Sequence, residues 1–584
     1  MAKWYVTMKQ GDFNGIAQRL HISPMIARII RNRGMIGDAE TEQFLSGTLA
    51  DMHSPNLMKD MEQACLILKE KIQQGKKIRI IGDYDIDGIC ATYILKKGLV
   101  YCGAIVDTEI PHRIIDGYGL NEELVRIAYE AGIDTIVTCD NGIAAYEQIE
   151  DANQHGMTVI ITDHHEVPKR IPSAAAVIDP KQEDCHYPYE GICGAVVAYK
   201  LIVCLLAGMG IDAKEELLCE LLTFAAMATV GDVMDLIDEN RIIVKYGLRE
   251  IAATKNPGLH ALLVVTELEG KEITPYHIGY ILGPCLNASG RLDTAKRALE
   301  LFETTNTAEA NRIAGDLKAL NYRRKEMTVG GVKEAVEQVE AANYSFDKVI
   351  VLYLPHCHES LAGIIAGKVR ERYDRPSFVF TDAEEGVKGS GRSIEAYSMY
   401  EELKKHQELY TKFGGHKMAA GLSMPTENVE RFRQVINATC TLTEEDCIPK
   451  IQIDIPMPLI YATKELAEEI NILEPFGNGN PKPVFAQKNL RLLSGRLMGA
   501  KTNVGKYVVE DEQHNRFTCI YFGDIQKLHG EIVHQYDKAM QEALYTPQGI
   551  DIPISIVYAM DINEYRGNRN LQIIMKDYDL AVCK

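Results

Sequence analysis

The chain has 584 residues, of which 46% are hydrophobic and 25% are charged, and its formal net charge is −19. This length is too great for one hydrophobic core, so we expect several domains with the composition of an ordinary globular protein. The acidic charge excludes a general grip on nucleic acid and restricts any DNA or RNA track to a local groove.

The chain shows no targeting or membrane signal. Residues 1–5 do not resemble a secretory signal, and no apolar run is long enough to span a bilayer. The 14 cysteines contain no Cys-x-x-Cys pair, which argues against a zinc ribbon or a thioredoxin motif. We therefore expect a cytoplasmic protein with reduced thiols.

In chain order, the pattern of apolar residues and turn signals predicts five segments. They are an N-terminal helical segment (1–60), an α/β domain (61–270), a connecting helical region (271–344), a second α/β domain (345–447) and a C-terminal domain (448–584). The connecting region ends in a long amphipathic helix at 307–340. The last segment alternates apolar and polar residues between turn signals, which predicts a small β-barrel.

Three short apolar runs of the first α/β domain each end in acidic or histidine residues. Residues 77–81 precede Asp83, Asp85 and Asp87, residues 135–139 precede Asp140, and residues 157–162 precede Asp163, His164 and His165. Helix-length sequence separates the runs, which indicates a parallel sheet with its carboxyl ends at one edge. Carboxylates crowded at such an edge repel one another unless cations neutralise them. The pattern predicts a metal site.

Other interpretations of these motifs exist. The Asp-x-Asp-x-Asp-Gly pattern also begins an EF-hand loop, but the twelfth position from Asp83 is Ile94 instead of the required Glu. A phosphatase with an aspartate nucleophile fits the first motif alone, whereas the histidines favour Mn²⁺ or a similar ion. An aspartate after a strand can also be only the N-cap of the next helix. Three such motifs on successive strands argue against that explanation for all of them.

The second α/β domain carries residue types that bind phosphate. Arg392 stands among small residues in 389–393, so its guanidinium can reach a phosphate. Residues 413–417 and 419–421 are interpreted as a glycine loop that opens onto a helix whose free N–H groups hold an anion. His358 precedes a predicted helix and can be either a phosphate contact or a structural residue of the helix start.

These motifs together resemble those of the DHH phosphoesterase superfamily, and closely those of its bacterial branch, the single-strand-specific RecJ exonucleases. The first three family motifs are matched at 83–88, 138–142 and 162–165, and the fourth at Gly231-Asp232. Residues 358–363, 389–393 and 414–421 resemble the motifs of the DHH-associated domain. Residues 284–292 and 474–481 resemble stretches typical of the bacterial branch.

The resemblance implies a set of site residues. The implied metal ligands are Asp85, Asp87, Asp140, His164 and Asp232, with Asp83 and His165 at the edge of the catalytic site. The implied substrate-binding residues are Arg113, Tyr118, Arg291, His358, Ser390, Arg392, Gly415 and His416. Two divalent ions are expected, preferably Mn²⁺, with Mg²⁺ also able to serve.

Some positions outside this set are further candidates or depart from the family. Arg323 and Arg324 are candidates for the channel between the α/β domains. In the barrel, which the resemblance makes OB-like, the candidates for strand binding are Arg491, Arg496, Lys501, Lys506 and Tyr507. Cys285 and Cys357 stand where the family often has Arg and Trp, and both positions could touch the nucleotide.

The resemblance implies an exonuclease that hydrolyses single-stranded DNA processively from the 5′ end, releases mononucleotides and serves repair and recombination. The expected partners are single-stranded DNA and a single-strand-binding protein or helicase, and a monomer is the simplest state. Alternatives are a phosphodiesterase for short oligonucleotides or dinucleotides and a non-catalytic DNA-binding scaffold. The segments at both ends argue against the first alternative, and the intact acidic and histidine positions argue against the second.

Overall fold

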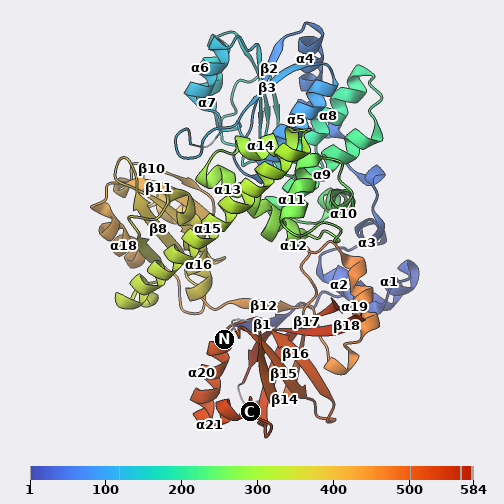
Figure 1. Cartoon of the computed structure of the whole chain (residues 1–584), viewed down its shortest axis with the longest axis vertical. Helices are drawn as coiled ribbons and strands as arrows, with labels where there is room; N and C mark the ends of the chain where they lie inside the picture. Colours follow the sequence, from blue (N-terminus) through green and yellow to red (C-terminus); the bar gives the residue numbers. More distant parts are fainter. Residues whose placement is uncertain (1, 118, 500–501, 566–567, 581–584) are drawn as a thin grey trace. The chain divides into compact units, whose positions relative to one another are not determined.

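The structure of the chain is a computed structural model that describes residues 2–117, 119–499, 502–565 and 568–580. It contains two compact units, which we describe separately (Figure 1). The larger unit is Thr48–Cys447, and the smaller combines Met1–Gly47 with Ile448–Lys584. Among the described residues, no helix has both the length and the apolar character to cross a membrane.

The first half of the larger unit is built on a five-stranded parallel sheet in the order β3-β2-β4-β5-β6. Its strands are β2 (Lys77–Ile81), β3 (Ile105–Glu109), β4 (Thr135–Cys139), β5 (Thr158–Thr162) and β6 (Ala176–Ile178). The predicted parallel sheet is therefore confirmed. The chain leaves β2 toward β3 on one side and later returns to β4 on the other, which is the switch point where such sheets bind ligands.

Helices cover both faces of this sheet, because its strands present apolar side chains to either side. Its helices are α4 (Met61–Gln73), α5 (Ile86–Tyr101), α6 (Glu122–Glu130), α7 (Tyr146–Gln154), α8 (Gly194–Met209), α9 (Glu215–Gly231), α10 (Asp238–Ala252) and α11 (Pro257–Val265). One core contains α4, α5, α8 and α9 with Ile78 and Ile80 of β2, and the other contains α6 and α7 with Ile81. Figure 1 shows α6 and α7 on the opposite side of the sheet from α5 and α8.

A helical segment connects the two halves of the larger unit. It consists of α12 (Pro275–His277), the π-helix η3 (Ile278–Leu282), α13 (Gly283–Leu292), α14 (Lys296–Glu303) and α15 (Thr307–Ala341). The long helix predicted at 307–340 is α15, whose 35 residues span about 50 Å. It packs on α11, α13 and α14 and, at its other end, on α16.

The second half is a five-stranded mixed sheet in the order β10-β11-β9-β8-β7. Its elements are β7 (Ile350–Tyr353), α16 (Glu359–Tyr373), β8 (Ser377–Asp382), β9 (Val387–Arg392), α17 (Met399–Lys404), β10 (Lys412–Gly415), β11 (Ala419–Met424) and α18 (Asn428–Thr439). The interpretation of 413–421 as a glycine loop before a helix is wrong, because Gly414 and Gly421 are paired residues of the antiparallel β10–β11 hairpin. Gly415 has a φ of 143°, and a Cβ there would lie 2.4 Å from the carbonyl oxygen of Ala419.

The smaller unit is built around a closed five-stranded barrel, which confirms the predicted OB-like fold. Its strands are β14 (Phe485–Met498), β15 (Val504–Glu510), β16 (Arg516–Tyr521), β17 (Ile552–Tyr565) and β18 (Asn568–Asp579), and pairing of β14 with β17 closes it. The remaining elements are β1 (Lys3–Val6), α1 (Phe13–Leu20), α2 (Pro24–Asn32), α3 (Asp38–Ser46), β12 (Lys450–Ile453), β13 (Ile455–Pro456), α19 (Lys464–Ile470), α20 (Ile525–Gln535) and α21 (Lys538–Ala543).

The first 47 residues belong to the smaller unit because they pack on its C-terminal part. Strand β1 pairs with β12 in parallel. Beside it, Arg33 Nη1 lies 2.7 Å from Asp454 Oδ1 in a buried ion pair. Ile26 and Ile29 of α2 are fully buried in the same core as the barrel. The sequence offered no sign of this pairing between residues so far apart.

Candidate active site

The carboxyl ends of β2, β4 and β5 carry the acidic and histidine residues expected from the sequence. Since these strands are adjacent and parallel, their ends meet at one edge of the sheet. Asp232 joins them from the C-cap of α9. We call the set the acidic centre: Asp83, Asp85, Asp87, Asp140, His164, His165 and Asp232.

His164 stands in the middle of the acidic centre. Its Nε2 lies 3.1 Å from Asp140 Oδ1, 3.5 Å from Asp87 Oδ2 and 3.8 Å from Asp232 Oδ2. Among the described residues, three groups have ligand atoms within 4.8 Å of one another: Asp140 with His164 and His165, Asp87 with His164 and Asp232, and Asp83 with Asp85 and Asp140. All seven predicted catalytic residues therefore come together, and Asp140 and His164 each belong to two groups.

The N-terminus of α8 supports the acidic centre. Asp87 Oδ2 accepts the N–H of Gly194 at 2.7 Å, and Asp87 Oδ1 accepts that of Ala195 at 2.8 Å. A Cβ on Gly194 would lie 2.8 Å from the Cβ of Asp140, so only glycine lets the helix approach this closely. Free N–H groups at a helix start favour the ionised form of a carboxylate.

Asp163 positions the two histidines. Its Oδ1 accepts the N–H groups of His164 and His165 and lies 2.7 Å from His165 Nδ1, while its Oδ2 accepts the N–H of Ile143. Burial raises the pKa of Asp163, but the hydrogen bond and charge of His165 outweigh burial and the net shift is downward. Burial lowers the pKa of His165, but Asp163 outweighs it and raises that pKa to about 9.

The charges of the acidic centre fit divalent cations. Burial, and then the neighbouring carboxylates, raise the pKa values of Asp83, Asp85 and Asp140, and raise that of Asp232 to about 8. In the described part of the chain, Asp83 Oδ1 is buried without a hydrogen-bond partner. Mixed carboxylate and imidazole ligands suit Mn²⁺ and similar ions, whose charge removes this repulsion.

These shifts predict opposite effects of pH on stability with and without metal. In chelator, the folded protein retains protons on these carboxyls above pH 4, where the unfolded chain has lost them, so its stability falls as the pH rises toward the Asp232 pKa of about 8. We expect Tm in chelator to fall by roughly 5 °C between pH 5 and pH 8. With saturating Mn²⁺ it should instead rise, because metal binding requires deprotonated ligands.

Thermal unfolding across this pH range, with chelator and with Mn²⁺, measures both slopes. The matched variant Asp232→Asn should flatten the slope in chelator. Equal slopes with and without Mn²⁺ would contradict a metal site at these carboxylates.

A basic rim lies next to the acidic centre. It consists of Arg113, Arg291, Arg324 and Arg392. Burial, and then the charges of Arg113, Arg324 and Arg392, lower the pKa of Arg291 to about 10, and Asp85 is also close enough to affect it. In the described part of the chain, none of these four guanidinium groups forms an ion pair with a carboxylate. Crowded guanidinium groups without acidic partners are suited to bind phosphate.

Arg291 connects the two halves of the larger unit. Its Nη1 donates to the carbonyl oxygen of Ser360 at 2.7 Å, and Ser360 Oγ donates to the carbonyl oxygen of Arg291 at 3.0 Å. His358, the N-cap residue of α16, has its Nδ1 2.8 Å from Ser360 Oγ. Gly290 directly precedes Arg291 in α13. A Cβ on Gly290 would lie 2.4 Å from the carbonyl oxygen of Tyr84, so glycine allows α13 to approach the loop between Asp83 and Asp85.

Ser390 and Arg392 lie on one face of strand β9. They lie opposite Gly363 of α16, which has no side chain. A Cβ on Gly363 would lie 2.7 Å from Arg392 Nη2 and 2.8 Å from Ser390 Oγ, so the glycine makes room for both. Arg392 Nη1 donates to the carbonyl oxygen of Gly391 at 2.8 Å. Burial, then Arg113 and Arg370, lower the pKa of Arg392.

Arg113, Gly415 and His416 complete the predicted substrate-binding residues that the structure describes. The guanidinium of Arg113 stands 4.7 Å from the centre of the Tyr84 ring. His416 lies at the tip of the β10–β11 hairpin, where partial burial and then Arg392 lower its pKa; Glu166 opposes this shift and His165 adds to it. Gly415 precedes it in the hairpin. Tyr118, which is also predicted to bind substrate, falls outside the described residues.

Two residues at positions that depart from the family differ in their surroundings. Cys285 is buried between α13 and α15, where Asn321 Nδ2 donates to its Sγ at 3.3 Å, so the expectation that it could touch the nucleotide is wrong. Cys357 is half-buried just before α16, next to His358. Burial lowers the pKa of His358. The charge of Glu359 opposes this shift, and the charge of Arg323 adds to it.

The strand-binding candidates of the barrel differ in exposure. Tyr507 is fully buried in the barrel core with its hydroxyl 3.2 Å from that of Tyr545, so it cannot stack on a base. Arg491 forms an ion pair with Asp551 at 2.5 Å. Arg496 and Lys506 are exposed, and Lys501 falls outside the described residues.

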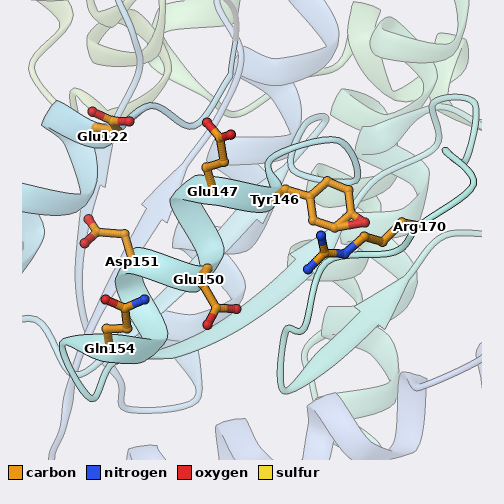
Figure 2. Close-up of a pocket in the computed structure, with 7 residues that line it drawn as sticks. All are labelled: Glu122, Tyr146, Glu147, Glu150, Asp151, Gln154 and Arg170. Carbon is orange, nitrogen blue, oxygen red and sulfur yellow. The ribbon is translucent and has the colours of Figure 1, made fainter.

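A pocket of about 480 Å³ on α6 and α7 has a different character from the acidic centre (Figure 2). It is lined by Glu122, Tyr146, Glu147, Glu150, Asp151, Gln154 and Arg170. The guanidinium of Arg170 stands 4.6 Å from the centre of the Tyr146 ring. Its exposed carboxylates would repel a phosphate backbone, and we assign it no part in the site.

Sequence reasoning overlooked two contributions to this site. Asp163 was noted only as part of a motif, although it orients both histidines. Gly194 and Ala195 were not singled out, although they bind Asp87 through their backbone. The available signal was a pair of small residues at the start of a long apolar helix.

Three domain families match the chain in order. They are the DHH family N-terminal domain at residues 77–229, the DHHA1 domain at 346–442 and the RecJ OB domain at 453–577. The single-stranded-DNA-specific exonuclease RecJ of Bacillus subtilis is 35% identical over 580 residues, which cover 98% of this chain and 70% of the relative.

Two crystal structures of RecJ are similar to the chain over nearly its whole length. The crystal structure of RecJ from Thermus thermophilus in complex with Mn²⁺ superposes with a TM-score of 0.82 and 26% identity, over 100% of this chain and 80% of that one. The same protein in complex with Mg²⁺ gives a TM-score of 0.75 and 25% identity, over 99% and 78%.

Proposed function

The chain belongs to the RecJ family of DHH phosphoesterases, and we propose that it is a metal-dependent exonuclease that hydrolyses single-stranded DNA in repair and recombination. The observation that carries this proposal is the acidic centre lying next to the basic rim, with Arg291 close to Asp85. A phosphodiester needs both: charge neutralisation where its bond breaks and guanidinium groups for the neighbouring phosphates.

Five residues of the acidic centre would hold the metal: Asp85, Asp87, Asp140, His164 and Asp232. We propose two ions, preferably Mn²⁺. The number two is supported because Asp140 and His164 each belong to two ligand groups. Bound divalent ions would supply hydroxide at neutral pH and neutralise the charge that develops on the phosphoryl oxygens. Asp163 would fix the imidazole of His165, whose raised pKa suits a protonated contact to the scissile phosphate.

The basic rim would set the polarity. Ser390, Arg392, Gly415 and His416 would hold the 5′-terminal phosphate, while Arg113, Arg291 and His358 would contact the scissile phosphate or its neighbour. A terminal phosphate held at a fixed distance from the metal would make the enzyme release one mononucleotide at a time. Tyr118 is included in this set by resemblance alone.

The remaining parts of the proposal concern context. We propose that residues 61–270 form the catalytic domain, 271–344 the connection, 345–447 the substrate-binding domain, and 448–584 the domain that holds the strand, with 1–60 as an N-terminal segment. The protein would act in the cytoplasm as a monomer and would cooperate with a single-strand-binding protein or a helicase.

Digestion of a long single strand labelled at either end tests the activity and its polarity. With Mn²⁺, labelled mononucleotide should be released at once from the 5′ end, and no release is expected in chelator. A duplex of the same sequence with blunt ends should remain intact. Release from the 3′ end first would overturn the polarity, and absence of cleavage in any metal would overturn the exonuclease.

A further inference from the structure

Two stacked tyrosines stand on the surface of the segment that leads into α13. The ring centres of Tyr276 and Tyr280 lie 4.9 Å apart with an angle of 26° between the ring planes. Tyr276 is 61% exposed and Tyr280 is 68% exposed. Tyrosine is enriched at interaction surfaces, where its ring offers an apolar face and its hydroxyl stays in water.

Both tyrosines stand in helical turns whose backbone is hydrogen-bonded and packed on the core. Tyr276 lies in α12, where the N–H of Thr274 donates to His277 Nδ1 at 3.0 Å and fixes the helix start. Tyr280 lies in the π-helix η3, where the N–H of Gly283 donates to the carbonyl oxygen of Ile278. Ile278 and Leu282 are fully buried and anchor this turn from below. Single π-helical turns occur frequently at functional sites.

The segment that carries the tyrosines ends close to the residue that precedes Asp232. A Cβ on Gly283 would lie 3.4 Å from Ile86 Cδ1, and one on Gly231 would lie 2.5 Å from Ile86 Cγ2. Ile86 stands between Asp85 and Asp87, and Gly231 directly precedes Asp232. Tyr280 comes three residues before Gly283 and Tyr276 seven, which is roughly 5 and 10 Å along a helix axis. Gly283 therefore lies close to Gly231 and Asp232, and the stacked pair lies further along the helical segment that leads away from them.

We propose that the Tyr276–Tyr280 stack binds a base of the single strand that leads to the acidic centre. The inference rests on the proposed function. Stacking on an aromatic ring accepts every base, which suits an enzyme that degrades any sequence. It also needs no positive charge, and this chain has a net charge of −19 that limits how much of its surface can attract phosphates.

The test compares the double variant Tyr276→Ala/Tyr280→Ala with Tyr276→Phe/Tyr280→Phe, which keeps both rings. On a long single strand, the alanine variant should show a KM raised about tenfold with kcat changed less than about twofold. The phenylalanine variant should behave like the wild type. Tyr129→Ala is the matched control, because Tyr129 is also an exposed tyrosine in a ring pair, with its ring centre 4.5 Å from that of His155 on the surface of α6 and α7.

A scan with single abasic nucleotides provides a readout that a structural role would not move. In the wild type, one abasic position near the 5′ end should raise KM, and the alanine variant should lose this sensitivity at the same position. An alanine variant with unchanged KM, or one that keeps the abasic effect, overturns the proposal and leaves the stack as a contact for a protein. Failure of the wild type to cleave any single strand would overturn the proposed function instead.

Discussion

Replacing Asp140 with asparagine is expected to lower kcat for hydrolysis of single-stranded DNA by about 10³-fold or more. Asp140 Oδ1 lies 3.1 Å from His164 Nε2, and the residue belongs to two of the three potential ligand groups. Asparagine keeps the volume and one oxygen but loses the negative charge that a divalent ion requires. Initial rates of mononucleotide release at saturating Mn²⁺ measure the loss.

Whereas the activity of Asp140→Asn should fall, its thermal stability without metal should not. The pKa of Asp140 is raised well above its usual value by burial and then by Asp87, so its ionised form destabilises the folded protein without metal. Tm of Asp140→Asn in chelator should therefore equal or exceed that of the wild type above pH 7. Asp151→Asn, in the exposed acidic pocket of Figure 2, is the control and should retain activity within about twofold. A variant of Asp140 with a tenth or more of the wild-type rate would contradict the assignment.

The acidic centre could be predicted from sequence because its residues follow directly from strand ends. Once β2, β4 and β5 were recognised as parallel strands, the positions of Asp83, Asp140 and His164 at one edge followed from sheet geometry. Asp232 came only through resemblance, since it follows a helix and no strand pattern points to it.

The second half of the larger unit was predicted less well, because glycine has more than one structural use. Residues 413–421 have the glycines of an anion-binding helix start, but they form a hairpin in which Gly415 avoids the carbonyl oxygen of Ala419. Gly363 is needed for a different reason, since it leaves space for Arg392. Such needs depend on what lies opposite in space and are invisible in the local sequence.

Packing between distant residues also decided which candidates face solvent. Tyr507 lies on a strand that alternates apolar and polar residues, and the barrel closure placed it inside with Tyr545. Cys285 was turned toward Asn321 of α15. Neither direction can be inferred before the partner element is known.

Arg392→Ala is expected to reduce kcat/KM on a 5′-phosphorylated strand by about 10- to 100-fold, since a hydrogen bond to a charged group contributes about 1.5–3 kcal/mol. The reduction on a 5′-hydroxyl strand should be much smaller, because that end has no phosphate to lose. Arg392 lies beside Ser390 in the gap left by Gly363, and its pKa is lowered by burial and then by Arg113 and Arg370, as expected for a guanidinium without an acidic partner.

The comparison of the two ends separates recognition of the end from general attraction of DNA. Arg392→Lys retains the positive charge but not the fork of donors, so it should recover only part of the rate. Arg126→Ala is the control, because Arg126 already forms ion pairs with Glu123 and Glu130 on the surface of α6 and is expected to act like the wild type. Equal losses on phosphorylated and hydroxyl ends would mean that Arg392 attracts the strand without defining its end. Polarity would then have to come from the order in which the acidic centre and the basic rim meet the strand.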